Sequence, residues 1–354
     1  MQEEFTGTMP VQDKHRFDVE RLERYLSGHV EAFAGPLTVE QFAGGQSNPT
    51  FLLSTPGRRY VLRRKPPGKL LPSAHAVDRE YRVISALRQV AIPVARPYVL
   101  CEDDAVIGTA FYVMDYVEGR VLWDQSLPGM DRHQRAAIYD ELNRVIAALH
   151  RVDYIAAGLG DYGKPGSYLE RQIGRWTKQY RASETEKIEA MERLIEWLPG
   201  HIPAQDETSV VHGDYRLDNV IFHPTEPRIV AVLDWELSTL GHPLADFSYH
   251  CMSWRLEPGR LRGIAGLDLP ALGIPSEEEY VQMYCRRTGR ISIPNWDFYM
   301  AYNLFRLAGI CQGIMGRVVD GTAANPKALE SGRRARPLAE AGWRQVEAIV
   351  SKGD

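Results

Sequence analysis

The sequence predicts an α+β chain in two lobes, with strands first and helices after them. Short runs rich in β-branched and aromatic residues, separated by Gly and Pro turns, fill the chain up to about residue 117. Longer stretches with apolar residues at helical spacing dominate the remainder. A chain of 354 residues is long enough for two lobes, and we expect them over residues 1–116 and 117–354.

Composition and charge indicate an ordinary globular enzyme. Hydrophobic residues make up 44% and charged residues 25% of the chain. The net charge of −4 gives no reason to expect a nucleic acid or an anionic membrane surface as partner. No apolar run reaches membrane-spanning length, the start of the chain is polar, and the four cysteines form no metal-spaced pair. We therefore expect a soluble, cytoplasmic protein with reduced thiols.

The first lobe is expected to combine a sheet with one main helix. Apolar residues repeat at helical spacing in two of its segments, and residues 37–42 alternate as in a strand. The predicted helices are residues 18–27 and 76–90, and the predicted strands are residues 37–42, 51–54, 59–64, 93–99 and 105–117.

Two features of this lobe are candidates for binding phosphate. Gly44 and Gly45 lie in a turn between strands, where backbone N–H groups can approach phosphate oxygens, although such a turn can also be a plain hairpin. Arg63 offers a permanent cation with a forked geometry on the strand 59–64. Glu80, near the start of the following helix, is its natural partner. Arg64 points to the opposite face of the strand, and we expect it to be solvated.

The second lobe is predicted to be largely helical. Residues 131–151 carry an apolar stripe, and Ser183 and Ser276 each begin a sequence typical of a capping box. The helix 295–317 carries Tyr302 and Arg306 near one face. That stripe suits the wall of a pocket for an acidic or amphiphilic substrate, and it suits equally well an amphipathic helix with solvated arginines.

Residues 209–236 contain the strongest chemical pattern, and they are predicted to form a strand, a polar loop, a second strand, a Pro-bearing turn and a third strand, so that the last two strands make a hairpin. This arrangement places Asp214, Asn219 and Asp234 at strand ends or on a tight loop. Phosphoryl transfer from a nucleotide needs a carboxylate that orients the attacking hydroxyl and two oxygen ligands that hold magnesium. Each Asp alone could be a turn or cap residue. The three together favour phosphoryl transfer.

His212-Gly213-Asp214, then Asn219, then Leu233-Asp234-Trp235-Glu236 resembles the pattern of the aminoglycoside phosphotransferase and choline kinase family. The resemblance implies a protein-kinase-like fold, in which an antiparallel sheet with one main helix precedes a larger, mostly helical lobe. It implies ATP and Mg²⁺ as cofactors, Asp214 as the catalytic residue, and Asn219 and Asp234 as metal ligands. It also implies that Asp246 is buried and braces the loop, and that His212 is structural.

The resemblance also implies a set of nucleotide-binding residues. The turn at residues 44–48 would lie over the phosphates, Arg63 with its partner Glu80 would pair with them, and the backbone of residues 115–117 would meet the adenine edge. These residues are Gly44, Gly45, Gln46, Ser47, Asn48, Arg63, Glu80, Asp115, Tyr116 and Val117. Arginine at position 63 departs from the lysine of kinases, which leaves open a nucleotide-binding module without useful transfer.

The chain resembles in particular the branch of this family found beside, or fused to, acyl-CoA dehydrogenases. The resemblance is carried by the stretches 45–50, 73–75, 79–80, 233–236 and 305–306. It implies a kinase for the hydroxyl of a hydroxy acid or hydroxyacyl-CoA, with Tyr302 and Arg306 toward the substrate and a functional link to an acyl-CoA dehydrogenase.

Three alternatives remain open at this point. An aminoglycoside or other amino-alcohol kinase would need a site lined with carboxylates for a polycation, and the helix 295–317 offers more cations than acids. A catalytically weak nucleotide-binding module is the second alternative. A protein kinase is the third, and it is disfavoured because Trp235 and Glu236, rather than Phe and Gly, follow Asp234.

Overall fold

The computed structural model describes residues 7–43, 48–66, 76–259, 261–323 and 327–353. Two compact units make up the chain. Unit 1 contains Met1–Trp123, Ile155–Gly160 and Asp218–Ser238, and unit 2 contains Asp124–Tyr154, Asp161–Leu217 and Thr239–Asp354. The predicted α+β class, an antiparallel N-terminal sheet followed by a helical part, is confirmed. The lobe boundary at residue 116 stays a prediction.

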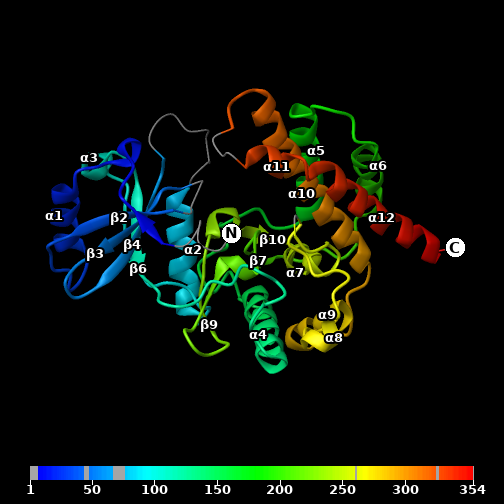
Figure 1. Cartoon of the computed structure of the whole chain (residues 1–354), viewed down its shortest axis with the longest axis horizontal. Coiled ribbons are helices and arrows are strands. Elements are labelled where there is room, and N and C mark those ends of the chain that lie inside the picture. Colours follow the sequence, from blue (N-terminus) through cyan, green and yellow to red (C-terminus); the bar gives the residue numbers. More distant parts are fainter. Residues whose placement is uncertain (1–6, 44–47, 67–75, 260, 324–326, 354) are drawn as a thin grey trace. The chain divides into compact units, whose positions relative to one another are not determined.

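Unit 1 is built on a six-stranded antiparallel sheet in the order β1-β2-β3-β4-β6-β5 (Figure 1). Its strands are β1 Thr8–Met9, β2 Thr38–Phe42, β3 Thr50–Ser54, β4 Arg59–Arg64, β5 Pro97–Cys101 and β6 Phe111–Asp115. The helices of this unit are α1 Val19–His29, α2 Val77–Gln89 and α3 Asp104–Ile107.

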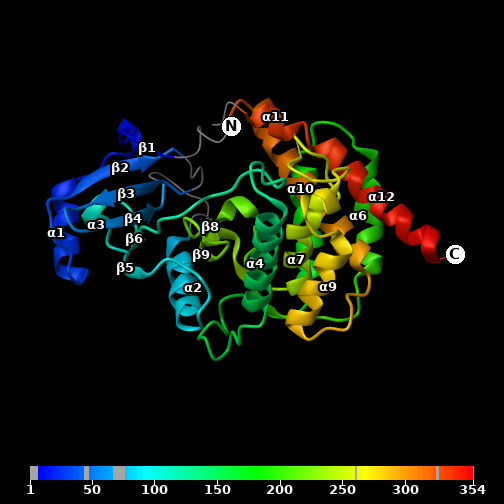
Figure 2. The same cartoon turned by 60° about the horizontal axis from the view of Figure 1, so that its bottom comes forward.

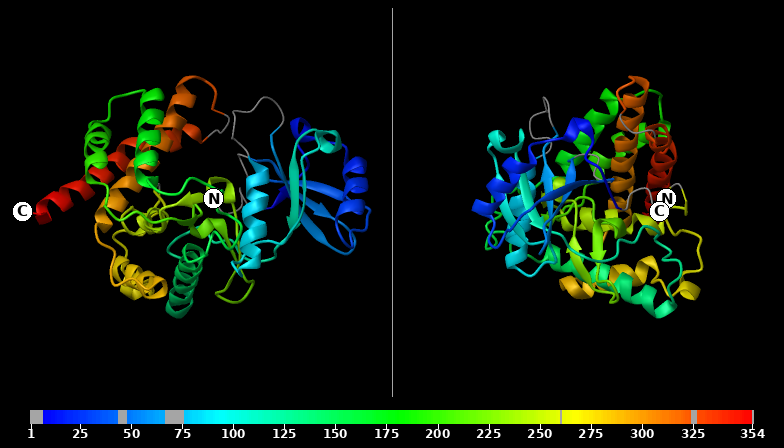
Figure 3. Two further views of the ribbon diagram at one scale, coloured as in Figure 1. Left: turned by 180° about the vertical axis from the view of Figure 1, so that it is seen from behind. Right: turned by 60° about the vertical axis from the view of Figure 1, so that its left-hand side comes forward.

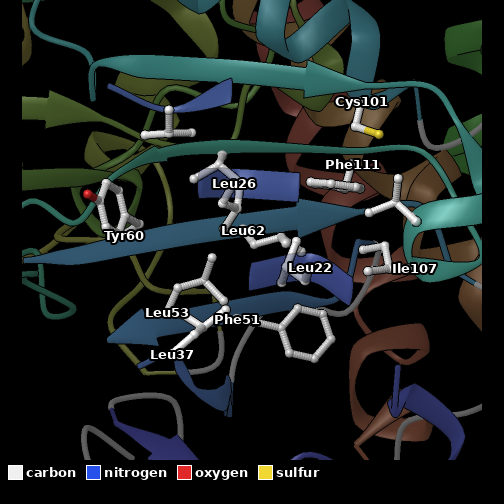
Figure 4. Packing of buried hydrophobic residues seen from close by; sticks show 13 residues of the cluster. Leu22, Leu26, Leu37, Phe51, Leu53, Tyr60, Leu62, Cys101, Ile107 and Phe111 are labelled. Carbon is white, nitrogen blue, oxygen red and sulfur yellow. The ribbon is translucent and has the colours of Figure 1, made fainter. Parts of the chain in front are cut away.

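Alternation along the strands separates two faces of this sheet. Leu22 and Leu26 of α1 pack against Phe51, Leu62 and other apolar side chains on one face (Figure 4). The neighbouring strand positions, such as Val61 and Arg63 of β4, point to the other face, on the side of α2.

Arg64 corrects one prediction. Its side chain does point away from Arg63, but it is buried rather than solvated. Its guanidinium donates to the carbonyl oxygens of Ile107 and His15 and lies over the rings of Phe17 and Phe51. A buried guanidinium on the apolar face is tolerated because carbonyl oxygens and aromatic faces replace water.

The strand predicted over residues 105–117 is also corrected. Residues Asp104–Ile107 form the short helix α3, because the Asp103 carboxylate accepts a hydrogen bond from the Ala105 N–H. Gly108 ends the helix in the left-handed conformation, and strand β6 begins only at Phe111.

A small hairpin completes unit 1. Strands β8 Val220–Phe222 and β9 Ile229–Val232 pair antiparallel, as predicted, around a Pro-bearing turn. Arg120, just after β6, bridges to Phe222. A Cβ atom at Gly119 would lie 2.2 Å from the Phe222 carbonyl oxygen, so only glycine allows this close approach. The short 3₁₀ helices Leu217–Asn219 and Trp235–Leu237 flank the hairpin.

Unit 2 is mostly helical and centres on α10 Trp296–Val319. This helix is buried on nearly all sides over its first half, and α5, α7, α11 and α12 pack against it. Figures 2 and 3 both show α10 beside α12. The other helices are α4 Arg132–His150, α5 Tyr168–Ala182, α6 Glu189–Trp197, α7 Pro243–Cys251, α8 Leu269–Leu272, α9 Glu277–Thr288, α11 Ala328–Gly332 and α12 Ala335–Gly353. Strands β7 Ser209–Val211 and β10 Thr239–Gly241 pair antiparallel.

One of the two predicted capping boxes is present. Ser276 accepts from the Glu279 N–H, and the Glu279 carboxylate accepts from the Ser276 N–H at the start of α9. Ser183 instead follows the end of α5, and its hydroxyl donates back to the Gln179 carbonyl oxygen. In the part of the chain that the structure describes, no helix is long and apolar enough to span a bilayer.

Candidate active site

A pocket of about 480 Å³ opens within unit 1. Strands β4 and β6 and the hairpin β8–β9 supply most of its walls. One wall of the pocket is apolar, and another carries polar and charged side chains. The apolar lining includes Val61, Ile84, Ala95, Met114, Val121, Ile221 and Val232, and the polar lining includes Asn48, Arg63, Asn219, Asp234 and Glu236. This volume and this division of walls are typical of a small-molecule site.

Arg63 is the centre of a charge network at the polar wall. Its Nε lies 3.0 Å from Oε2 of Glu80, and its Nη2 lies 3.2 Å from Oδ1 of Asp234. The ion pair predicted between Arg63 and Glu80 is therefore confirmed. Glu80 also accepts hydrogen bonds from Asn48 Nδ2 at 2.7 Å and from the Tyr112 hydroxyl at 3.0 Å.

Burial and charge act in opposite directions on this network. Burial by itself would lower the pKa of the Arg63 guanidinium, but the negative charge of Glu80, with those of Asp234 and Glu236, raises it. Burial raises the pKa of Glu80, while Arg63 and the hydrogen bonds from Tyr112 and Asn48 oppose that shift. Arg63 therefore stays a cation at every physiological pH.

Asp234 and Asn219 both line this pocket. Asp234 follows β9 in the left-handed conformation, at φ 63° and ψ 61°, which Asp tolerates better than most residues. The Leu233 N–H donates to the Asn219 carbonyl oxygen at 2.8 Å, so the backbone joins the two positions across the hairpin. Trp235 is buried, and its indole N–H donates to the Val232 carbonyl oxygen. Carboxylate and amide oxygens at one wall suit a hard divalent cation.

The other predicted nucleotide-binding residues divide into two groups. Gly44, Gly45, Gln46 and Ser47 lie outside the described residues. Asp115, Tyr116 and Val117 line the pocket in unit 1. The Asp115 carboxylate accepts hydrogen bonds from Arg58 Nη2 at 2.8 Å and from the Tyr98 hydroxyl at 2.6 Å, so its side chain is held by the sheet.

In unit 2, a buried carboxylate accepts backbone hydrogen bonds from the loop after β7. Asp246 of α7 accepts hydrogen bonds from the N–H groups of His212 and Gly213, at 2.7 and 2.8 Å. His150 of α4 lies 3.1 Å from the same carboxylate. Gly213 has φ +84°, a conformation that side chains rarely adopt. Asp246 is buried and hydrogen-bonded, as the family resemblance implies.

The hydrogen bonds of Asp246 also set its charge state. Burial alone would raise the pKa of this carboxyl, but hydrogen bonds from His150 and from the His212 backbone lower it below its ordinary value. His212 is buried, and its Nδ1 accepts the N–H of Asp214 at 3.1 Å. This contact supports the predicted structural role of His212, because the nitrogen is committed to the loop itself.

Tyr249 and Arg216 both contact the Asp214 side chain within unit 2. The Tyr249 hydroxyl donates to Asp214 Oδ1 at 2.6 Å, and Nε of Arg216 lies 3.1 Å from the same oxygen. The Asp214 side chain keeps 18% of its surface exposed. Burial raises the pKa of Tyr249, so this phenol remains a hydrogen-bond donor. Asp214 is thus held in place and partly accessible.

Tyr249 is a contact that the sequence interpretation missed. It follows Asp246 by three residues on one helix, and that spacing places both side chains toward the same loop. The register of α7 was therefore the signal that could have identified it.

Of the two predicted substrate residues, Arg306 contacts the same loop. Arg306 donates from Nη2 to the Gly213 carbonyl oxygen at 2.7 Å and stacks over the ring of Tyr249, 4.9 Å from its centre. Both Arg306 and Tyr302 are buried. The structure thus shows a loop contact for Arg306, and a contact with substrate stays a prediction for both residues.

Comparison with known proteins agrees with this geometry. A family model described as the phosphotransferase enzyme family matches residues 38–302. A crystal structure from Ralstonia eutropha JMP134, provisionally described as an aminoglycoside phosphotransferase, is 63% identical with a TM-score of 0.88, over 94% of this chain and 99% of that one. A ternary complex of an aminoglycoside phosphotransferase APH(4)-Ia variant with AMP-PNP and hygromycin B has the same fold, at 19% identity and a TM-score of 0.58, over 92% and 98% of the chains.

Curated relatives are longer proteins. Acyl-CoA dehydrogenase family member 10 of Mus musculus is 48% identical over 340 residues, which are 95% of this chain and 32% of that protein. The chain therefore spans about a third of the length of this relative. Together, these matches confirm the resemblance and the protein-kinase-like fold inferred from the sequence.

Proposed function

Because the chain belongs to the phosphotransferase enzyme family, whose members are kinase-type enzymes with a hydroxyl acceptor, we propose that it transfers the γ-phosphate of ATP to a hydroxyacyl substrate. The observation that carries the proposal is that the chain contains both of the sites that phosphate transfer needs. One is the charged pocket of unit 1, and the other is the braced, partly exposed Asp214 of unit 2.

The pocket of unit 1 is proposed to bind the nucleotide. Its apolar wall suits a purine ring, with the backbone of residues 115–117 at the adenine edge. Arg63 pairs with phosphate oxygens, and Glu80 holds its guanidinium in place. Asn219 and Asp234 supply the oxygen ligands for Mg²⁺, which neutralises charge on the phosphates when bound. The AMP-PNP held by the APH(4)-Ia variant supports a nucleotide in this fold.

Asp214 is proposed to align the acceptor. Its carboxylate accepts the hydrogen bond of the substrate hydroxyl and takes up that proton as the new oxygen–phosphorus bond forms. The bond between the γ-phosphorus and the bridging oxygen of ADP breaks in the same step. Positioning and charge neutralisation provide most of the rate, because this transition state needs little covalent help.

A hydroxyacyl acceptor is favoured by two observations. The curated relative is named as an acyl-CoA dehydrogenase family member, which supports a functional link to such a dehydrogenase. In addition, Arg216 and Arg306 accompany Asp214 in unit 2, and cations suit an anionic acceptor better than a polycation. Aminoglycosides are the second candidate, because the description of the Ralstonia protein names them.

The test is acceptor-dependent ADP formation by the purified chain with Mg-ATP. The acceptors are hydroxy acids, hydroxyacyl-CoA thioesters, aminoglycosides and choline, with Asp214→Asn as the inactive control. We expect turnover with a hydroxyacyl compound and none with the polycations. Turnover with aminoglycosides alone would replace the hydroxyacyl assignment, and the absence of any acceptor-dependent turnover would contradict the kinase assignment.

A further inference from the structure

The residue before Asp214 has both of its backbone polar groups bound by buried, charged side chains. The Gly213 N–H donates to the Asp246 carboxylate at 2.8 Å, and the Gly213 carbonyl oxygen accepts from Arg306 Nη2 at 2.7 Å. Gly213 also has φ +84°, a conformation that glycine adopts without steric cost. A negative and a positive group therefore fix the peptide groups on both sides of Gly213, and with them the direction in which the chain enters Asp214.

Arg306 is a buried cation whose hydrogen bond to this loop is shielded from water. It lies in the first half of α10, and only 7% of its surface is exposed. Within the described part of the chain, no carboxylate lies within ion-pair distance of its guanidinium. Its Cζ atom lies 4.9 Å from the centre of the Tyr249 ring and 5.8 Å from that of Trp176. Because no water competes at this depth, the bond to the Gly213 carbonyl oxygen is strong and holds that group rigidly.

The same guanidinium acts on Asp214 by a second route. The Tyr249 ring, which Arg306 covers, carries the hydroxyl that donates to Asp214 Oδ1 at 2.6 Å. A cation over the ring face holds the ring in place. Burial raises the pKa of the Tyr249 phenol, and the charges of Arg216 and Arg306 oppose this shift, which makes the phenol a better hydrogen-bond donor. Both routes from Arg306 therefore end on one carboxylate.

Arg306 is itself placed by the packing of α10 against α7. Asn303, nearly one turn earlier on α10, is fully buried. Its Nδ2 donates to the Ala245 carbonyl oxygen at 2.9 Å and to Ser248 Oγ at 2.7 Å. These buried hydrogen bonds fix the register of α10 along α7, the helix from which the loop is held. The position of the Arg306 guanidinium relative to the loop is thus set by the core of unit 2.

We propose that Arg306 is a positioning residue for phosphate transfer: by fixing the Gly213 carbonyl and the Tyr249 ring, it sets the direction in which Asp214 meets the acceptor hydroxyl. The inference rests on the proposed function and holds whatever the acceptor is. It replaces the substrate contact expected for Arg306, because the guanidinium is bound to the loop. A displacement of about 1 Å at a reacting group can slow a reaction about 10²-fold, so a loosened loop lowers kcat without weakening substrate binding.

The experiment compares Arg306→Met with Arg64→Met. Arg64 is a matched control, because it is a buried arginine of unit 1 that donates to two carbonyl oxygens, lies over two aromatic rings and has no part in the proposed chemistry. We expect Arg306→Met to lower kcat about tenfold to hundredfold, the effect of one hydrogen bond to a charged group, and to leave KM for ATP and for the acceptor unchanged. Arg64→Met should leave kcat near that of the unsubstituted protein.

Two further variants separate positioning from general damage to unit 2. Arg306→Lys keeps a cation that can donate to the Gly213 carbonyl oxygen but lacks the forked guanidinium. Its kcat should lie between those of Arg306→Met and the unsubstituted protein, and it carries the test if Arg306→Met does not fold. Arg306→Met/Tyr249→Phe should lose clearly less kcat than the product of the two single losses, because both side chains hold one carboxylate.

Three results would overturn the inference. A higher KM for the acceptor with an unchanged kcat would make Arg306 a substrate contact. An equal fall of kcat in Arg64→Met would show that the loss of any buried arginine has this effect. Fully multiplicative losses in Arg306→Met/Tyr249→Phe would show that the two side chains do not act through the same carboxylate.

If the unsubstituted protein phosphorylates no acceptor, the proposed function has failed, and hydrogen exchange then decides the inference separately. The backbone N–H groups of His212 and Gly213 should exchange faster in Arg306→Met than in the unsubstituted protein, because the loop has lost one of its buried contacts. Their exchange should be unchanged in Arg64→Met. Equal exchange in all three proteins would reject the positioning role.

Discussion

At the scale of single residues, Asp214 depends on the side chains that hold it. Tyr249 donates to one of its oxygens at 2.6 Å, and the ring of Tyr249 is covered by Arg306. We expect Tyr249→Phe to lower kcat about tenfold, which corresponds to one hydrogen bond to a charged group, and to leave KM for ATP unchanged. Steady-state kinetics with Mg-ATP and a saturating acceptor measure both constants.

The matched control is Tyr139→Phe. Tyr139 donates its hydroxyl to the Gln125 carbonyl oxygen at 2.6 Å elsewhere in unit 2. Each substitution removes one hydroxyl from a buried aromatic side chain, so an equal fall of kcat in the two variants would mean that general destabilisation, and not the position of Asp214, is responsible.

Arg63 has a structural and a proposed nucleotide role, and a double substitution separates them. Arg63→Met leaves Glu80 buried without its ion pair, so we expect the free energy of unfolding to fall by about 3 kcal/mol and Mg-ATP affinity to fall as well. Adding Glu80→Gln removes the unpaired charge and keeps a partner for Asn48 and Tyr112.

Denaturant titration of the double variant should show much of the lost stability restored, while calorimetry should still show weak Mg-ATP binding. If nucleotide affinity returned together with stability, Arg63 would have only its structural role.

At the scale of elements, helix α7 carries both the carboxylate that holds the loop after β7 and a histidine whose protonation affects stability. It carries Asp246, Tyr249 and His250. Burial lowers the pKa of His250 to about 4, although the charge of Asp246 opposes the shift. The ring lies among Tyr215, Trp254 and Tyr280, and its Nε2 is 2.8 Å from the Tyr280 hydroxyl.

This shift predicts how stability depends on pH. Above pH 6.5 His250 is neutral in both the folded and the unfolded chain, so its full contribution is present. Between pH 6.5 and about 4 only the unfolded chain takes up the proton, and stability falls as pH falls, by about 3 kcal/mol over this window. Urea titrations at several pH values across this range give the free energy of unfolding at each pH. This free energy should fall less with falling pH in His250→Gln than in the unsubstituted protein, and an equal fall in both would contradict the assignment.

The elements also show which features local sequence can predict. Alternation predicts the two faces of β4, and the kinase pattern of a cation on this strand with a carboxylate on the following helix predicted the pairing of Arg63 with Glu80. The burial of Arg64 was not, because it depends on Ile107 and His15, which are distant in sequence. Ser183 shows a further limit. Its motif fits a cap, but its hydroxyl bonds back into α5, and a motif does not reveal which helix a residue belongs to.

At the scale of the whole molecule, the two units carry different parts of the proposed chemistry. Asn219 and Asp234 belong to unit 1, and Asp214, in the same stretch of sequence, belongs to unit 2. The spacing of these residues predicted the chemistry, because a short loop limits where each side chain can lie.

The most direct test of the central claim measures Mg-ATP affinity and phosphate transfer on the same preparation of Asp214→Asn. We predict an affinity close to that of the unsubstituted protein and a loss of transfer by about 10²–10⁴-fold, the usual contribution of a positioned acid–base group. Asp234→Asn should instead weaken Mg-ATP binding. Unimpaired transfer by Asp214→Asn, or a loss of nucleotide binding that accounts for its lost activity, would contradict the division of roles between the pocket of unit 1 and the loop of unit 2.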